Sequence, residues 1–206
     1  MYARVASFEN MDPSLTDDLV GRIRERVPDL ERELPGARGT LGLLDREARR
    51  SLGITFFDSA EAIEEAAPVF ERMGEEIPEQ MRGRRAAVEV YEVVLYEVAD
   101  EGAKAARVST LEGAAERIDE AAYHGRESIL PRAREMSGWK GAVSLADRQS
   151  GKIKLITLWE SEDALRASEE QAERLRQESA DSGGQRIVGV ERYEVSFAAR
   201  LAELRV

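Results

Sequence analysis

Apolar and polar positions along the chain follow the same succession of patterns twice. Residues 2–9 and 105–112 are short runs rich in β-branched and aromatic residues, which is typical of strands. Each run is followed by apolar residues that recur every three or four positions, the spacing of one helix face. These stripes are Leu15, Leu19, Ile23, Leu30 and Leu34 in the first half and Ile118, Ala122, Ile129, Ala133 and Met136 in the second. The pattern predicts a strand followed by a helix at the start of each half.

Proline and glycine divide these helical stretches at matching places. Pro28 and Pro131 fall inside the two stripes. Because proline has no backbone N–H to donate, we expect each helix to kink or restart there. Gly36 and Gly138 follow the last apolar position of each stripe, where a helix commonly ends on a residue of positive φ.

The rest of each half predicts two more strands, a second helix and a last strand. The strands are expected at 38–45, 52–57 and 87–97 in the first half and at 140–147, 153–159 and 187–197 in the second. Ser59 and Ser161 are the predicted N-caps of the second helices. Asp45-Arg46 and Asp147-Arg148 begin the turns between the middle strands, and we interpret them as turn ion pairs. Each half is therefore predicted to be a ferredoxin-like β-α-β-β-α-β unit.

A shift of 102 residues aligns the two halves. The matched pairs include Gly36/Gly138, Leu43/Leu145, Asp45/Asp147, Ile54/Ile156, Thr55/Thr157, Ser59/Ser161, Glu71/Glu173 and Tyr91/Tyr193. Before the first glycine the shift becomes 103, as in Arg4/Arg107 and Pro28/Pro131, so one residue was inserted or deleted between Pro28 and Gly36. We interpret the chain as a tandem duplication, with one unit at 1–98, a second at 103–206, and a linker at 99–102.

The third strands indicate how the units pack. The runs at 54–57 and 153–159 do not alternate between apolar and polar residues. A sheet with helices on one face and water on the other should alternate. The sequence therefore predicts an α+β protein in which two four-stranded sheets face one another, so that both faces of each sheet are buried.

Composition narrows the class of protein further. The chain has 206 residues, of which 42% are hydrophobic and 34% charged, as in a soluble globular protein. Its net charge of −11 argues against nucleic acid as a partner, because phosphate backbones attract basic surfaces. No apolar run is long enough to span a membrane, and the N-terminus has no secretory signal pattern, so we expect a cytoplasmic protein.

The scarcity of two residue types limits the chemistry. The sequence has no cysteine, which excludes disulfides, thiolate nucleophiles and Cys-ligated zinc or iron–sulfur sites. The single histidine, His124, excludes a multi-histidine metal site within one chain and argues against a Ser-His-Asp triad. We therefore expect no metal and no cofactor of the protein's own. Carboxylates, arginines, tyrosines, tryptophans, a borrowed cofactor and the substrate's own reactivity remain as sources of chemistry.

Two segments resemble a known family. They are residues 129–141, ILPRAREMSGWKG, and residues 157–165, TLWESEDAL. They are similar to the proline-containing helix end, glycine turn and "W-E-S-x-x-A" strand-to-helix junction of the antibiotic biosynthesis monooxygenase-like (ABM-like) members of the dimeric α/β-barrel superfamily. Less complete versions occur at 34–39 and 57–62. The resemblance implies tandem ferredoxin-like units packed sheet-to-sheet as an intramolecular dimeric α/β barrel.

The same resemblance implies a mixed set of functions. The family includes cofactor-independent oxygenases of polycyclic phenols, haem-degrading enzymes and members with no known activity. The histidine that binds haem in the family lies on the second helix of the unit, whereas His124 lies on the first helix of the second half. We therefore disfavour haem degradation and expect His124 at the surface. Asn10, after the first strand, is interpreted as a helix-entry residue.

Trp159 and Tyr193 are the candidate substrate-binding residues. Trp159 ends the third strand at the motif position, where an indole N–H could bind a substrate oxygen while the ring packs on a flat ligand. Phe57 occupies the matching place in the first half and has no N–H, so the second half is the favoured one. Tyr193 could line the same pocket, and both residues could equally be core aromatics. No catalytic residue is assigned.

Two hypotheses for function remain open. One is a cofactor-independent oxygenase-like protein that acts on a small aromatic or polycyclic metabolite between sheet and helices. In such a reaction the deprotonated substrate reacts with O2 directly and the pocket supplies orientation and desolvation. The other is a non-catalytic small-molecule-binding or structural domain of the same fold. A fused pair of units is expected to be a monomer, and further association through the helices is the alternative.

Overall fold

The computed structural model describes residues 1–99 and 102–204. Asp100 and Glu101 of the predicted linker lie outside the described residues, as does the side chain of Leu30 in the first predicted stripe. None of the helices within the described ranges is long and apolar enough to cross a membrane.

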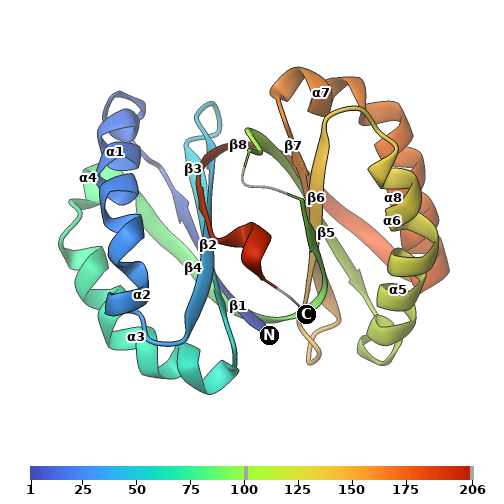
Figure 1. The fold of residues 1–206 in the computed structure, drawn as a ribbon, viewed down its shortest axis with the longest axis horizontal. Coiled ribbons are helices and arrows are strands. Elements are labelled where there is room, and N and C mark those ends of the chain that lie inside the picture. The colour runs from blue at the N-terminus through green and yellow to red at the C-terminus, as the bar shows by residue number, and fades with distance from the viewer. Residues whose placement is uncertain (100–101, 205–206) are drawn as a thin grey trace. The chain divides into compact units, whose positions relative to one another are not determined.

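The helices and strands follow the same order in both halves (Figure 1). The first half contains β1 (Tyr2–Glu9), η1 (Pro13–Leu15), α1 (Thr16–Arg26), η2 (Val27–Asp29), α2 (Leu30–Glu33), β2 (Ala37–Asp45), β3 (Arg50–Phe57), α3 (Ala60–Glu75), α4 (Glu79–Arg82) and β4 (Arg84–Val98). The second contains β5 (Ala105–Gly113), η3 (Ala115–Arg117), α5 (Ile118–His124), the π-helical turn η4 (Gly125–Ile129), α6 (Leu130–Arg134), β6 (Trp139–Ala146), β7 (Lys152–Trp159), α7 (Glu162–Ala167), α8 (Glu169–Gly183), β8 (Gln185–Ala199) and η5 (Leu201–Glu203). The predicted α+β class is confirmed.

Local sequence signals end and begin these elements as predicted. Gly36 and Gly138 have φ of 80° and 76°, the left-handed conformation that glycine adopts without steric cost. Ser59 accepts a hydrogen bond from the N–H of Ala62 at 3.2 Å and so caps α3. Ser161 accepts one from Ala164 at 3.1 Å and caps α7 in the same way.

The two prolines interrupt their helices as predicted, in different ways. Pro28 lies in the 3-10 turn η2 that separates α1 from α2. Pro131 lies at the start of α6, after the π-helical turn η4. Both arrangements avoid the clash between the proline ring and the preceding turn of a regular helix.

The ion pairs expected inside the β2–β3 and β6–β7 turns do not form among the described residues. Asp45 instead accepts a hydrogen bond from Arg50 across the hairpin at 2.9 Å. Arg46 reaches Asp17 on α1 at 2.8 Å, and Arg148 reaches Asp119 on α5 at the same distance. The arginines of the turns therefore connect the hairpins to helices. A long arginine side chain can extend past the carboxylate beside it in the turn and pair with a carboxylate on the neighbouring helix.

The described chain forms two compact units that share two long strands. The first unit is Met1–Val90 with Val195–Leu204, and the second includes Tyr91–Glu194. Strand β4 therefore begins in the first unit and ends in the second, and β8 does the reverse. The hydrogen-bonded strand order is β1-β3-β2-β8-β5-β7-β6-β4, and it closes into an eight-stranded barrel. This order confirms the predicted fold class.

Within the first unit, helices α1 and α3 cover one face of the sheet (Figure 1). Residues 54–57 are all buried, as the lack of alternation predicted. Phe57 packs with Leu34 and Ile63 at one end of the helical layer. Met11, Leu19 and Leu44 form a second cluster at the other end. The space between these clusters holds the site described next.

Candidate functional site

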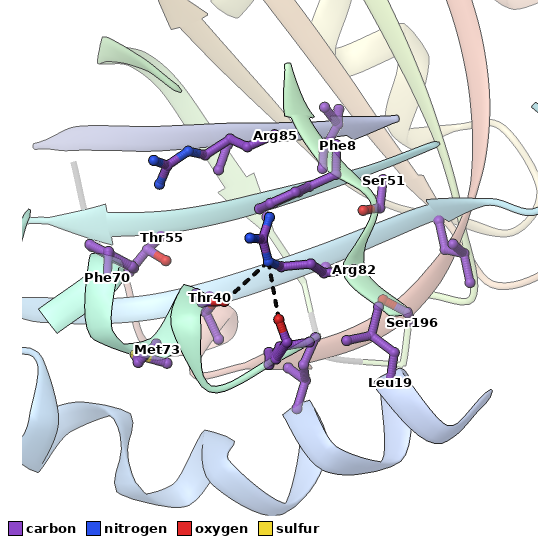
Figure 2. A pocket seen from close by; sticks show the side chains of 18 of the residues that line it. Phe8, Leu19, Thr40, Ser51, Thr55, Phe70, Met73, Arg82, Arg85 and Ser196 are labelled. Carbon is purple, nitrogen blue, oxygen red and sulfur yellow. Dashed lines mark hydrogen bonds between the residues drawn. The ribbon is translucent and has the colours of Figure 1, made fainter. Parts of the chain in front are cut away.

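A cavity of about 460 Å³ lies between the sheet and the helices of the first unit. Its volume is within the range of about 300–1,000 Å³ that is typical of small-molecule sites. Strands β1, β2 and β3 form its floor, and α1, α3 and α4 cover it. We call it the first-unit cavity (Figure 2).

The floor of the cavity consists of three rows of side chains that run across the strands. Alternate residues of a strand point to the same face of the sheet, and the strand register sets which residues are neighbours. The register gives the rows Arg4–Thr55–Thr40, Ala6–Gly53–Gly42 and Phe8–Ser51–Leu44. All nine of these residues line the cavity.

The middle row makes the floor hollow because it has almost no side chains. A Cβ atom placed on Gly53 would have no described atom within 4 Å. Gly42 serves another purpose, because a Cβ there would lie 2.1 Å from the ring of Phe197 on β8. Glycine at this position allows the Phe197 ring to pack directly on β2 and to line the cavity.

The corresponding space in the second unit is largely filled. The register places Ser109, Leu155 and Ser144 in one row across β5, β7 and β6. Leu155 is the residue that the 102-residue shift aligns with Gly53. The cavity on this side is about 80 Å³. Leu155 lines this smaller cavity, so its side chain occupies space that Gly53 leaves open in the first unit.

Apolar side chains form most of the remaining wall. Figure 2 shows Phe8, Leu19, Phe70 and Met73 around the space. The hydroxyl groups of Thr40, Thr55, Ser51 and Ser196 add the polar atoms, and Thr40 Oγ1 donates to the carbonyl oxygen of Ile54 at 3.1 Å. This lining fits a largely apolar molecule with few polar groups.

Arg82 closes the cavity at the end of α3. Its Nε donates to the carbonyl oxygens of Gly74 at 3.1 Å and Ile77 at 3.2 Å (Figure 2). The side chain therefore fixes the connection between α3 and α4. This arginine has a structural task and is not free to bind a ligand through the same nitrogen.

Arg4 is the one buried ionisable group in the lining. It is 8% exposed, whereas the acidic lining residues Glu71, Glu75 and Glu79 are all exposed. Its guanidinium carbon lies 3.8 Å from the centre of the Phe70 ring, a cation–π contact. Within the described residues it has no hydrogen bond and no ion pair. In the sequence, Arg4 stood out only because it aligns with Arg107 in the internal repeat, and no functional role was predicted for it.

Burial and charge repulsion act together on this arginine. Burial, with repulsion from Arg85, lowers the pKa of Arg4 to about 10, and attraction to Glu71 opposes the shift in part. Glu71 itself is held by Arg85, which donates to both carboxylate oxygens at 2.6 and 3.0 Å. That pairing keeps the pKa of Glu71 below its ordinary value. Arg4 is therefore a cation without a dedicated counter-ion.

The predicted site residues of the second half lie in the protein core. Trp159 is 1% exposed and packs with Met136 and Leu165, and its Nε1 donates to Thr157 Oγ1 at 3.1 Å. Neither of the two cavities includes Trp159 or Tyr193 in its lining. Tyr193 is 5% exposed, and its hydroxyl donates to Glu191 at 3.2 Å. Ligand binding by these two residues stays a prediction.

The other residues considered from the sequence have local roles or none. Asn10 is exposed with φ of 59°, a conformation in which asparagine is enriched, so it shapes the turn after β1. The expectation that His124 lies at the surface is wrong, because His124 is half-buried at the end of α5 and its Nε2 is buried without a hydrogen-bond partner among the described residues. Among the described residues there is no group of three or more His, Asp or Glu side chains arranged to hold a metal.

The strand order and the helices outside the sheets give the fold of the dimeric α/β barrels. Solved structures agree with this fold. A proposed monooxygenase from Lactobacillus acidophilus NCFM has a TM-score of 0.67 at 9% identity, over 96% of this chain and 95% of its own. An anthrone oxidase-like protein has a TM-score of 0.65 at 14% identity, over 96% and 92%. The predicted resemblance to the ABM-like fold is confirmed at the level of structure.

Sequence comparison gives more limited information. No family model matches the chain. The uncharacterised protein Rv2557 of Mycobacterium tuberculosis is 26% identical over 212 residues, which span 100% of this chain and 90% of that protein. A second uncharacterised protein of the same organism, Rv2558, is 35% identical over 75 residues, or 36% of this chain. These relatives carry no statement of activity.

Two features of the sequence indicate the first-unit cavity without reference to the family motifs. One was the pair Gly53/Leu155, which the 102-residue shift aligns and which differs by a whole side chain. The other was a basic residue, Arg4, inside a strand whose neighbours are apolar. A charge at such a position is expensive to bury, so it was a candidate for function.

Proposed function

We propose that the first-unit cavity binds a small, flat, largely apolar molecule and that the protein acts on it as a cofactor-independent oxygenase. The observation that supports this most is the hollow middle row of the floor, Ala6–Gly53–Gly42, beneath an apolar roof. A site of this size and lining suits an aromatic or polycyclic metabolite. The anthrone oxidase-like neighbour has the same fold.

The reaction would need no external electron donor. An activated methylene group of a substrate such as an anthrone loses a proton, and the resulting carbanion reduces O2. One oxygen atom ends as the carbonyl oxygen on that carbon, the other leaves as water, and the two C–H bonds are broken. The four electrons lost by carbon equal the four gained by O2. The cavity would supply desolvation and orientation for this step.

Oxygen consumption tests the proposal. Wild-type protein is incubated with a panel of quinols, anthrones and flavonoids in an oxygen electrode. We expect at least one class to consume O2 above the uncatalysed rate. Gly53→Leu introduces the residue that the second half carries, and its side chain would occupy the empty space. We expect this variant to lower the rate at least about tenfold while leaving the circular dichroism spectrum unchanged.

Trp159→Phe is the matched variant for the second half. If that change removes turnover while Gly53→Leu does not, the site lies beside Trp159 as the sequence motif suggested, and the first-unit assignment is wrong. If no substrate class is turned over, but wild-type protein binds a polycyclic ligand and Gly53→Leu does not, the chain is a binding protein.

The second candidate function, a non-catalytic binding domain, is favoured by the carboxylates of the cavity. An effective general base has a pKa raised toward neutrality. Glu71 has a lowered pKa because of its hydrogen bonds with Arg85, and it is exposed. Catalysis in this cavity therefore requires a substrate that is acidic enough to ionise without a strong general base.

A further inference from the structure

We propose that the ligand of the first-unit cavity carries an oxyanion on an otherwise apolar ring system and that Arg4 is the residue that binds this oxyanion. A carboxylate, phenolate or enolate oxygen would satisfy the same chemistry. The inference rests on the proposed function, in that the cavity must be a ligand site. Beyond the proposed function, the inference specifies that the ligand is negatively charged and that Arg4 binds the charged group.

The first argument is that the buried guanidinium of Arg4 lacks hydrogen-bond and ion-pair partners among the described residues. Arg4 is 92% buried, since 8% of its surface is exposed, and a guanidinium offers five N–H donors. A buried charge is normally paired or hydrogen-bonded, because desolvation is costly otherwise. Among the described residues its guanidinium has no hydrogen bond and no ion pair, and its carbon lies over the face of Phe70. A ring face leaves the in-plane donors of the guanidinium available for a planar oxyanion.

The second argument comes from Arg107, the counterpart of Arg4 in the second half. Arg107 aligns with Arg4 and holds the same place in the sheet, opposite Thr157 as Arg4 is opposite Thr55. Its Nη2 donates to the carbonyl oxygen of Leu165 at 2.9 Å and to Glu169 at 3.0 Å. It also donates to Ser168 at 3.2 Å. The second half therefore supplies this arginine with an internal carboxylate.

The first half lacks these partners. The 102-residue shift aligns Ser168 and Glu169 with Ala66 and Ala67. Neither alanine has a side-chain acceptor. The unit with the large cavity is thus the unit that provides no counter-ion for its arginine, and the unit with the small cavity provides one. A ligand oxyanion in the first-unit cavity would take the place that Glu169 takes in the second unit.

The carboxylates around the cavity do not fill this role. Glu71, Glu75 and Glu79 are exposed, so water screens their charge. Glu71 is the one that influences Arg4, and both of its oxygens are engaged by Arg85. An oxyanion inside the cavity would face Arg4 in a medium of lower dielectric constant, where attraction is stronger.

Two fluorescent probes of nearly the same shape test the charge of the ligand. 8-Anilinonaphthalene-1-sulfonate carries a sulfonate, and N-phenyl-1-naphthylamine is the same ring system without it. Both are titrated into wild-type protein, Arg4→Met and Gly53→Leu. We expect wild-type protein to bind the sulfonate at least about tenfold more tightly than the neutral probe. Arg4→Met should lose that preference and keep its affinity for the neutral probe, and Gly53→Leu should weaken both.

Arg174→Met is the matched control. Arg174 is an exposed arginine of α8 in the second unit, so its loss changes the net charge by the same amount without touching the cavity. We expect it to bind both probes like wild-type protein. Arg4→Gln serves as a second variant if Arg4→Met does not fold, with the same expected loss of preference.

The outcomes separate the two proposals. Equal affinity of wild-type protein for the two probes, unchanged in Arg4→Met but weakened by Gly53→Leu, overturns the role of Arg4 and leaves the cavity as a ligand site. Binding that Gly53→Leu does not affect, or no binding of either probe, overturns both. An equal loss of sulfonate binding in Arg174→Met would mean that net charge alone steers the probe, which also contradicts the inference.

Discussion

Arg4 and Arg107 present two solutions to one physical problem. Each places a largely buried arginine on the helix-facing side of its sheet. Arg107 Nη2 pairs with Glu169, which also bonds Arg192 at 2.7 Å, whereas Nε and Nη1 of Arg107 are buried without a hydrogen-bond partner among the described residues. Arg4 is left with an aromatic face. A residue that is costly for the empty fold is the expected mark of a binding site, since function and stability often conflict at such positions.

Removing each charge should therefore shift stability in opposite directions. Arg4→Met replaces an unpaired buried cation by an apolar side chain of similar length, and we expect the free energy of unfolding to rise by about 1 kcal/mol. Glu169→Gln leaves Arg107 buried without its carboxylate, and we expect a fall of about 2 kcal/mol. Urea denaturation followed by circular dichroism measures both. A clear loss of stability in Arg4→Met would mean that Arg4 is a structural residue.

Single residues were predictable where a local conformation required them. Gly36, Gly138, Ser59 and Ser161 follow from the geometry of helix ends, which involves only near neighbours in the chain. Trp159 shows the opposite case. Its position at the end of β7 was predicted, but its N–H is taken by Thr157, two residues earlier on the same face. Whether a buried aromatic side chain packs in the core or lines a pocket depends on the residues that surround it in the folded chain.

At the level of elements, strand register decides where the cavity forms. Alternation along β1 or β3 shows which residues share a face. It does not show which residue of one strand lies beside which residue of the next. Only the pairing Ala6–Gly53–Gly42 puts three small residues in one row. That coincidence makes a hollow, whereas the same residues out of register would give three shallow gaps.

Helix α3 must be anchored for the roof of the cavity to hold, and its cap provides a direct test. Ser59→Ala removes the hydrogen bond to the Ala62 N–H, so we expect the free energy of unfolding to fall by about 1 kcal/mol. Equilibrium urea denaturation gives the value. Ser59→Asp, which can also cap, should retain most of the stability, and an equal loss in both variants would contradict a capping role.

On the scale of the whole molecule, the compact units differ from the sequence repeats. The repeats end near residue 98, but the first unit gives up the end of β4 and gains Val195–Ala199 of β8. In the second unit the end of β4, residues 92–98, pairs with β6. Each unit therefore contains a strand segment that belongs to the other repeat.

Cutting the linker should not release two independent proteins. A protease site placed at residues 99–102 would give two fragments, and we expect them to remain in a 1:1 complex with the mass of the uncut chain. Each fragment supplies a strand segment to the other's sheet, so they should separate only in denaturant. Size-exclusion chromatography with light scattering measures this, and it also tests the proposed monomeric state of the intact chain. Two folded, separate fragments would contradict the shared strands.

The sequence by itself determined the order of elements, their caps and breaks, and the fold class. These depend on periodicity and on short-range backbone geometry, which a chain carries locally. The tertiary structure alone decided that the first unit is hollow and that its buried arginine lacks a counter-ion. Both properties arise from residues far apart in sequence, Gly53 beside Ala6 and Gly42, and Arg4 without the carboxylate that Arg107 has. Cavities and unpaired charges are properties of what surrounds a residue, and only the packed chain defines those surroundings.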